Sequence, residues 1–437
     1  MRFAIAVGLF FLMLAPGMFA QTASPSPAAA PAAAASPSGP TVAYTLPPDK
    51  LEKARALHDI HVRMRIIGTV WSLVVLVGLL YLGVVARYRN WAEKFSRFSF
   101  FQACLVVPLF LFTIDLLGLP LDVYGQSVSL RYGLSVQSWG SWFRDQAIGE
   151  ALGWVLGTIL LWLMIVIIRK FPKRWWIIFW FPAYAIFVLV MYGAPWVIDP
   201  LFNKFEPLDK NNPQLVSQIE KLTARSGLSI PRERMFLMKA SEKTTQLNAY
   251  VTGFGASKRI VVWDTTIQKT STPETLFVVG HEMGHYVLNH VVYGLLLGAA
   301  GLFIALYVIY LVSGWVLRRF GARWQIRELG DWASLPMIFL ILSVAGFFAA
   351  PIGNTISRQM EHNADVYGLE VTHGINPNSQ EAGAHAFQVL GELSLVYPYT
   401  SRLATFWYGS HPAIPDRVVF AHGYDPWSKG EPPKYVK

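Results

Sequence analysis

The sequence predicts a mainly α-helical membrane protein with about six transmembrane helices and one small α/β domain outside the bilayer. Hydrophobic residues make up 53% of the 437 positions and charged residues only 15%, which is too apolar for an ordinary soluble domain. Six runs are long enough to cross a hydrocarbon core of about 30 Å as helices. A polar section, residues 199–272, carries helix and strand patterns instead and predicts the small domain.

The N-terminal residues have the pattern of a targeting segment followed by a linker. Met1 and Arg2 precede a long apolar run, so residues 1–20 are expected to be a signal peptide or an uncleaved N-terminal anchor. Residues 21–48 are rich in Ala, Pro and Ser. Because this composition cannot build a core, these residues are expected to form a linker.

The membrane part is expected to divide into two regions. A four-span region is expected at residues 49–198 and a transmembrane hairpin at residues 291–357. Asp115 lies inside the second span, where a carboxylate is costly, so an interhelical hydrogen bond is favoured over a catalytic role. The individual spans are expected at about 66–86, 98–121, 151–168, 175–198, 291–317 and 334–354.

The loops between the spans differ in charge. Three of them are basic, and the positive-inside rule places these loops in the cytoplasm. Residues 199–290 and 358–437 then lie on the non-cytoplasmic face. The net charge is +10, but the cations form no single patch that would indicate nucleic-acid binding. The cations of the three loops are Arg87, Arg89, Lys94 and Arg97; Arg169, Lys170, Lys173 and Arg174; and Arg318, Arg319, Arg323 and Arg327.

Residues 199–290 are expected to form the first part of the small domain. Residues 213–226 have a helical pattern and follow a turn-forming Asn-Asn-Pro sequence. Two β-rich runs follow at about 245–252 and 258–264, separated by Gly253 and other turn residues. This arrangement predicts a β-hairpin.

The sequence HEMGH contains two histidines four residues apart. His281 and His285 share one face of a helix, so both imidazoles can point at one metal ion. Glu282 can take a proton from an attacking water, and Thr272 is expected to cap the helix. Two exposed histidines on a surface helix are the structural alternative. Cys104 is the only cysteine, which excludes a cysteine-rich metal site.

A third metal ligand is expected just after the last span, at the start of residues 358–437. Glu361 and Asp365 lie four residues apart and hence on one helix face. One of them can bind the metal while the other hydrogen-bonds a metal-binding imidazole. His362 would point about 100° away from Glu361 on a helix and is the alternative ligand. The transmembrane hairpin returns the chain to the side of the first helix, as a shared site requires.

Beyond the metal motif, several short segments resemble the type I CAAX prenyl endopeptidases, which are membrane gluzincins. The resemblance runs from near residue 100 to near residue 420. The segments that carry it are 131–135 (RYGLS), 200–205 with 207–208, 248–250 with 253, 258–261 with 264–265, 281–285, 361–365, 410–412 (SHP) and 416–417. Together they are far more specific than the metal motif alone.

The resemblance implies a zinc site of the gluzincin type on the active-site helix. One zinc ion per chain would be held by His281, His285 and Glu361. Asp365 would be the hydrogen-bond partner of a zinc-binding histidine.

The resemblance also implies a substrate-binding strand and two further catalytic residues. Asn248, Ala249 and Tyr250 would form an edge strand that pairs with the backbone of an extended substrate. His411 and Arg417 would approach the site from the C-terminal segment. His411 could donate a hydrogen bond to the oxyanion that forms during peptide hydrolysis.

These features predict an integral membrane zinc metalloendopeptidase that hydrolyses membrane-associated or CAAX-type peptides, with or without a lipid group, using Glu282 as general base. A catalytically silent scaffold or chaperone on the same fold is the alternative, and the presence of Glu282 argues against it. A transporter would predict paired half-helices and inverted repeats, which the sequence lacks. The family's prenyl-processing members face the cytoplasm, whereas the charge pattern here favours the opposite face.

Overall fold

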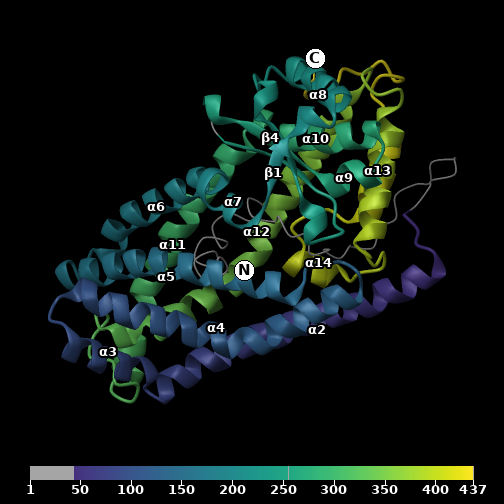
Figure 1. Cartoon of the computed structure of the whole chain (residues 1–437). Helices are drawn as coiled ribbons and strands as arrows, with labels where there is room; N and C mark the ends of the chain where they lie inside the picture. The colour runs from purple at the N-terminus through teal and green to yellow at the C-terminus, as the bar shows by residue number, and fades with distance from the viewer. Residues whose placement is uncertain (1–43, 254, 437) are drawn as a thin grey trace.

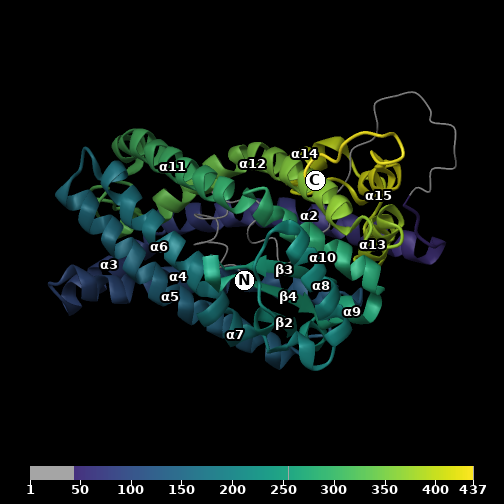
Figure 2. The same cartoon turned by 90° about the horizontal axis from the view of Figure 1, so that it is seen from above.

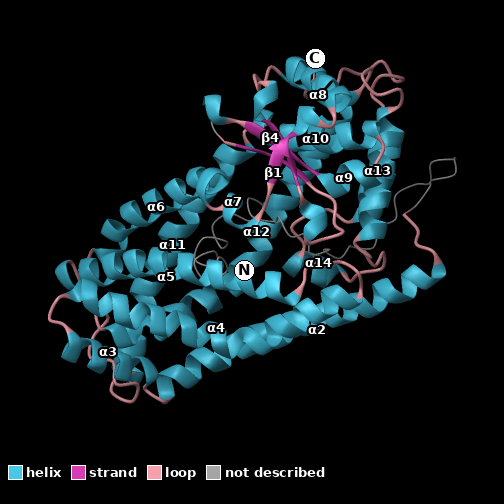
Figure 3. Ribbon diagram, in the orientation of Figure 1, coloured by secondary structure: helices cyan, strands magenta, loops and turns pink. Residues whose placement is uncertain are grey.

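The computed structural model describes residues 44–253 and 255–436. Long helices form a bundle, and a small sheet with shorter helices lies at one end of it (Figure 1, Figure 3). The predicted mainly α-helical fold with a small α/β domain is confirmed. The targeting segment expected at residues 1–20 and the linker up to residue 43 lie outside the described residues.

Six helices of the described residues are long and apolar enough to cross a bilayer, as predicted. The first ends at Tyr81, before the expected boundary, because the chain turns at Gly83 in a left-handed conformation (φ +60°). The last continues to Thr372, well beyond the predicted end at residue 354. The six are α2 (Pro48–Tyr81), α4 (Ser99–Arg131), α5 (Trp139–Lys170), α6 (Trp175–Val197), α11 (His290–Phe320) and α12 (Leu335–Thr372).

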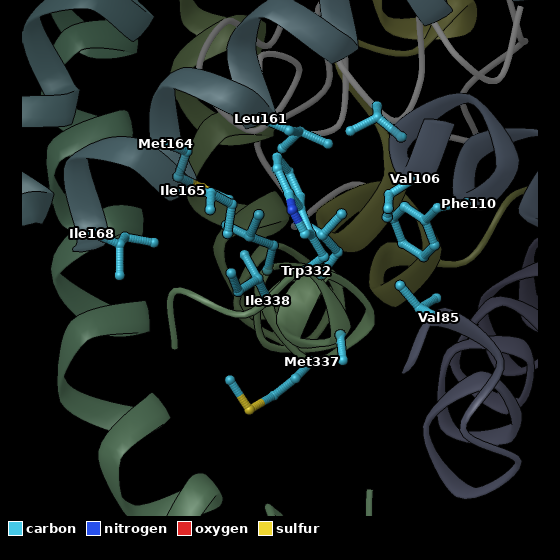
Figure 4. Close-up of a cluster of buried hydrophobic side chains, with 14 of the residues drawn as sticks. Val85, Val106, Phe110, Leu161, Met164, Ile165, Ile168, Trp332, Met337 and Ile338 are labelled. Atoms are coloured by element: carbon cyan, nitrogen blue, oxygen red, sulfur yellow. The ribbon is translucent and has the colours of Figure 1, made fainter. Parts of the chain in front are cut away.

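The largest apolar cluster of the membrane part contains side chains from all six long helices, and Figure 4 shows its part around Trp332. Trp332 is fully buried there, together with Phe110 of α4 and Ile165 of α5. The indole N–H of Trp332 donates to the side-chain oxygen of Gln102 (3.1 Å), so its polar atom is also satisfied. This packing fixes the beginning of the helix whose other end carries Glu361.

The three basic loops meet at the end of the bundle far from the sheet, beside α3 (Val84–Phe95), as two views agree (Figure 1, Figure 2). Arg89 forms a buried ion pair with Asp331. Arg169 donates a hydrogen bond to the carbonyl of Gly330 (2.8 Å). The loops that the charge pattern assigns to one side therefore lie together.

Asp115 also has the kind of partner that the sequence favoured. It hydrogen-bonds the side chain of Glu150, which lies on the neighbouring helix α5. This interhelical contact accounts for a carboxylate in the middle of a span.

The small domain contains a four-stranded sheet in the order β1-β2-β4-β3. The predicted hairpin is confirmed, since β3 and β4 pair antiparallel, whereas β2 and β4 pair parallel. β3 therefore has one free edge. The strands are β1 (Phe205–Pro207), β2 (Met235–Met238), β3 (Ala249–Thr252) and β4 (Arg259–Trp263).

Short helices surround this sheet. α8 occupies the residues that the sequence predicted to be helical, and α10 carries the HEMGH run. The α-helices are α7 (Asp199–Phe202), α8 (Pro213–Ser226), α9 (Asp264–Lys269), α10 (Thr272–Val287), α13 (Ser379–Leu393), α14 (Arg402–Tyr408) and α15 (Ile414–Gly423). The 3-10 turns are η1 (Leu208–Lys210), η2 (Arg232–Arg234), η3 (Ala240–Glu242), η4 (Gly255–Ser257) and η5 (Trp332–Ser334).

Candidate metal centre

α10 begins with a capping box, which fixes where the HEMGH run starts. The cap is Ser271 rather than the predicted Thr272, because Glu274 lies three residues after Ser271 and accepts a hydrogen bond from its backbone N–H (3.0 Å). Pro273 occupies the first turn, where no backbone N–H is needed. The helix then runs unbroken through both histidines of the motif.

Glycines let α10 and α12 approach each other closely. A Cβ atom at Gly280 would lie 2.8 Å from Cγ1 of Val371, and one at Gly368 would lie 3.1 Å from the backbone nitrogen of His281. Larger side chains at these positions would push the helices apart. The close contact brings Glu361, on α12, to the histidines of α10.

Three predicted ligand residues come together at this contact. Nε2 of His281 lies 3.3 Å from Nε2 of His285 and 3.3 Å from one carboxylate oxygen of Glu361. The other Glu361 oxygen lies 3.6 Å from Nε2 of His285. Ligand atoms about 2.0–2.2 Å from a tetrahedral ion lie about 3.3–3.6 Å apart, so the three donors fit such an ion. His362, the alternative ligand, packs its ring against Phe420 instead (4.6 Å between centroids).

The electrostatics of the group also suit a cation. Burial lowers the pKa of His285 to about 3, which keeps its imidazole neutral and able to act as a ligand. Burial acts in the same direction at His281, but hydrogen bonds to Asp365 and Glu361 outweigh it and raise the pKa to about 10. The carboxylates of Asp365 and Glu361 therefore favour a positive charge at His281.

A chain of contacts leads from His281 to a buried arginine. Nδ1 of His281 lies 2.9 Å from a carboxylate oxygen of Asp365. Arg417, on α15, donates two hydrogen bonds to the same carboxylate (2.9 and 2.6 Å). Both Asp365 (1% exposed) and Arg417 (6% exposed) are buried. Arg417 thus reaches the donor group through Asp365 and His281.

His285 has a different partner, His290. Nδ1 of His285 lies 3.1 Å from Nδ1 of His290, the first residue of α11. The chain reaches this position through Asn289, which adopts a left-handed conformation (φ +57°) between the two helices. The sequence analysis gave His290 no part in the site, so this contact was missed. The HEMGH run followed closely by a further histidine was the signal.

Glu282 and His411 lie on the accessible side of the group. Their side chains are 25% and 36% exposed, whereas that of Glu361 is 7% exposed. Nε2 of His411 lies 3.4 Å from a Glu361 oxygen, and its Nδ1 is 2.9 Å from the Ser410 hydroxyl. Burial raises the pKa of Glu282 to about 7.

The predicted substrate strand lies at the free edge of the sheet. Ala249 and Tyr250 belong to β3, and Asn248 directly precedes it. The Tyr250 hydroxyl hydrogen-bonds Asp199, which also pairs with Arg259 of β4 (3.1 Å). The side chain of Tyr250 is therefore engaged in holding the strand, and the backbone remains the part that can meet a ligand.

Comparisons with known proteins identify the family. Residues 209–424 match peptidase family M48, and residues 33–204 match the CAAX prenyl protease N-terminal region with five membrane helices. A Bacillus subtilis protein named uncharacterized metalloprotease YhfN is 36% identical over 78% of this chain and 78% of its own length. The chain belongs to peptidase family M48.

A further relative and a solved structure agree with this result. A rice protein named CAAX prenyl protease 1 homolog is 30% identical over 69% of this chain and 68% of its own length. The crystal structure of S. mikatae Ste24p superposes with a TM-score of 0.75 at 21% identity, covering 97% of this chain and 96% of that one. This M48 chain is thus a multi-pass membrane metalloprotease. That result decides against the scaffold and transporter alternatives.

Proposed function

We propose that the chain is a zinc endopeptidase whose ion is held by His281, His285 and Glu361. The observation that carries the proposal is the donor group itself, two imidazole nitrogens and a carboxylate oxygen that all lie within 4.8 Å of one another. A nitrogen and oxygen donor set of this size suits zinc, and three protein ligands leave one position open for catalysis. Zinc supplies a Lewis acid that polarises the scissile carbonyl and makes water a better nucleophile.

Glu282 and His411 then carry out the proton transfers and charge stabilisation. Glu282 follows His281 on α10, is partly exposed and has a pKa near neutrality, so its carboxylate can take the proton of the attacking water and return it to the leaving amine. His411 lies on the same accessible side and can donate a hydrogen bond to the developing oxyanion. Arg417 acts by positioning Asp365, which holds His281.

The substrates we propose are extended peptides of membrane-associated proteins, with CAAX-type peptides among them. The free edge of β3 offers backbone groups for strand addition. Relatives named CAAX prenyl proteases support the substrate class. We further propose that the site lies on the non-cytoplasmic face, because the basic loops gather at the opposite end of the bundle.

The first test is cleavage of a panel of quenched fluorescent peptides, farnesylated and unmodified, by purified protein in detergent. Glu282→Gln should retain zinc but lose activity by about 100-fold or more, since only the proton acceptor is removed. Glu220→Gln, a change on the surface of α8, is the matched control and should keep both properties. A wild-type protein without stoichiometric zinc would refute the proposed site, and a fully active Glu282→Gln variant would refute the mechanism.

Sidedness has its own measurement. Ser428 is exposed on the C-terminal part of the domain, and Cys104 is the chain's only cysteine. In a Cys104→Ser background, Ser428→Cys in intact cells should react with a membrane-impermeant maleimide if the domain is non-cytoplasmic. Labelling only after cell lysis would place the domain in the cytoplasm.

A further inference from the structure

The outer edge of β3 exposes the backbone of alternate residues. The backbone N–H of Trp263 donates to the carbonyl of Asn248 (3.1 Å), and Ala249 lies opposite Val262. Hydrogen-bonded and non-hydrogen-bonded pairs alternate along an antiparallel ladder. The backbone N–H and C=O groups of Ala249 and Val251 therefore turn away from β4. These are the positions at which an added strand would pair.

A segment of the membrane region already pairs with the chain just before β3. The N–H of Val136 donates to the carbonyl of Lys243 (3.0 Å), and the N–H of Thr245 donates to the carbonyl of Leu134 (3.2 Å). Lys243 and Thr245 are two residues apart and Thr245 precedes Ala249 by four, so all three are separated by even numbers of residues. Residues 134–136 therefore pair along the same side of the chain as the outer edge of β3, and Ala249 and Val251 farther along that edge remain unpaired there among the described residues.

The even-numbered residues between these two stretches contact α9. The carbonyl of Gln246 accepts a hydrogen bond from the Thr265 hydroxyl (2.7 Å). The N–H of Asn248 donates to the Thr266 hydroxyl (2.9 Å). Both partners lie on α9, directly after β4, so the backbone groups of Gln246 and Asn248 turn toward α9, although Lys269 of α9 also reaches the Thr245 carbonyl (3.1 Å).

The pairing at residues 133–136 is firmly anchored. The hydroxyl of Thr244 donates to the carbonyl of Leu134 (2.9 Å), and the hydroxyl of Thr245 donates to the carbonyl of Gly133 (2.7 Å). The N–H groups of Leu134 and the next residue both donate to the carbonyl of Ser129 at the end of α4 (2.9 and 3.1 Å). Displacing this segment would break several hydrogen bonds at once.

We propose that residues 133–136 form an end stop that limits how far a substrate strand can extend along the edge of β3. The inference rests on the proposed peptidase function and deepens it. Residues 134–136 run antiparallel to the chain that they cover, as the bridge between Ser135 and Thr244 shows. A substrate that pairs antiparallel in the same line runs from Thr252 toward Gln246 and meets Gly133 with its carboxyl-terminal side.

The end stop defines a class of substrates. Peptides that end shortly after the scissile bond stop before they meet residue 133. Internal segments of a long chain must leave the edge before Gly133 and lose their strand pairing there. The amino-terminal side of the substrate, beyond Thr252, meets no such paired segment among the described residues. The enzyme therefore favours scissile bonds near a free carboxyl terminus.

Two nested peptide sets test the end stop. One cleaved peptide is lengthened one residue at a time on the carboxyl-terminal side, and a matched set is lengthened on the amino-terminal side. For the first set, kcat/KM should stay level and then fall about tenfold or more once the chain reaches Gly133, whereas the second set should stay level. Equal tolerance on both sides, or a fall on the amino-terminal side, would overturn the proposal. Cleavage of no peptide at any length would overturn the proposed function itself and the end stop with it.

A double variant tests the residues that hold the stop. Thr244→Val with Thr245→Val removes both hydroxyl hydrogen bonds while keeping side-chain size. Cleavage of the long carboxyl-terminal peptides should then rise relative to the short ones. Thr223→Val, whose hydroxyl bonds to the Glu220 carbonyl inside α8, is the control and should leave the length profile unchanged. A length profile unaltered by the double variant would assign the limit to other residues and refute the assignment to 133–136.

Discussion

Replacing Arg417 by methionine should separate the contribution of the buried ion pair to folding from its contribution to metal binding. Methionine keeps an unbranched apolar stem but removes the guanidinium, which donates two hydrogen bonds to Asp365 and lies 4.1 Å from the ring centroid of Phe387. The change leaves the Asp365 carboxylate buried, with only His281 beside it. An unpaired buried charge is the main source of the expected effect.

The magnitudes follow from the burial of both partners. Removing one member of a buried pair costs about 3–5 kcal/mol of folding stability. Loss of a partner that holds a ligating histidine weakens metal binding by about 10–100-fold, which corresponds to about 1.4–2.7 kcal/mol. Asp365→Asn should have a similar cost because it leaves the Arg417 cation buried. The double variant should be less destabilised than the sum, since neither charge is then left alone.

The measurements are thermal unfolding in detergent and zinc affinity by competition with a chromophoric chelator. Arg232→Met, which breaks an exposed ion pair with Glu220, is the matched control and should change neither value. The reasoning would be refuted if Arg417→Met kept the wild-type midpoint and zinc affinity. It would also be refuted if the effects of Arg417→Met and Asp365→Asn simply added.

Variants at three further positions probe other contacts, each measured by the same two assays. Gly368→Ala places a methyl group 3.1 Å from the backbone of His281, so it should cost about 1–3 kcal/mol of stability and weaken zinc binding; unchanged affinity would show that the helices can adjust. His290→Phe removes the partner of His285 and should weaken zinc binding about 10–100-fold, while His290→Asn should restore part of it; equal loss in both would contradict the role assigned to a hydrogen bond at this position. Arg89→Met breaks a buried ion pair at the far end of the bundle and should lower stability by about 3–5 kcal/mol without changing zinc affinity; a change in affinity would contradict this separation.

The features that sequence patterns predicted are those set by local chemistry. Apolar runs longer than a bilayer core gave the six spans, and the spacing of His281 and His285 placed both on one helix face. Glu361 could be predicted as a ligand because it lies just beyond a span and four residues before Asp365, on the same helix face. The strand alternation around Gly253 likewise predicted the β3–β4 hairpin.

The features that escaped prediction depend on how distant segments meet. The contact between His285 and His290 requires the reversal at Asn289, whose backbone conformation no periodicity reveals. α12 continues without a break past residue 354, where the predicted span ended, although Pro351 lies inside it. Residues 134–136 find their partner more than a hundred positions away. The capping box could have been predicted from Ser271 and Glu274, but the sequence analysis expected Thr272 as the cap.

The helices that carry the donor group also set its depth relative to the membrane. α11 begins at His290, only a few residues after His285, so the motif lies next to the entry of a span. On α12, the stretch from Leu335 to Glu361 is about 39 Å long at ~1.5 Å per residue. A hydrocarbon core is about 30 Å thick, so a tilted α12 leaves Glu361 near the membrane interface. A peptide anchored in the bilayer reaches such a site at high effective concentration, whereas a soluble peptide has no such advantage. The hairpin between His285 and Glu361 therefore has a functional reason, because it ties both halves of the donor group to the surface where anchored substrates are found.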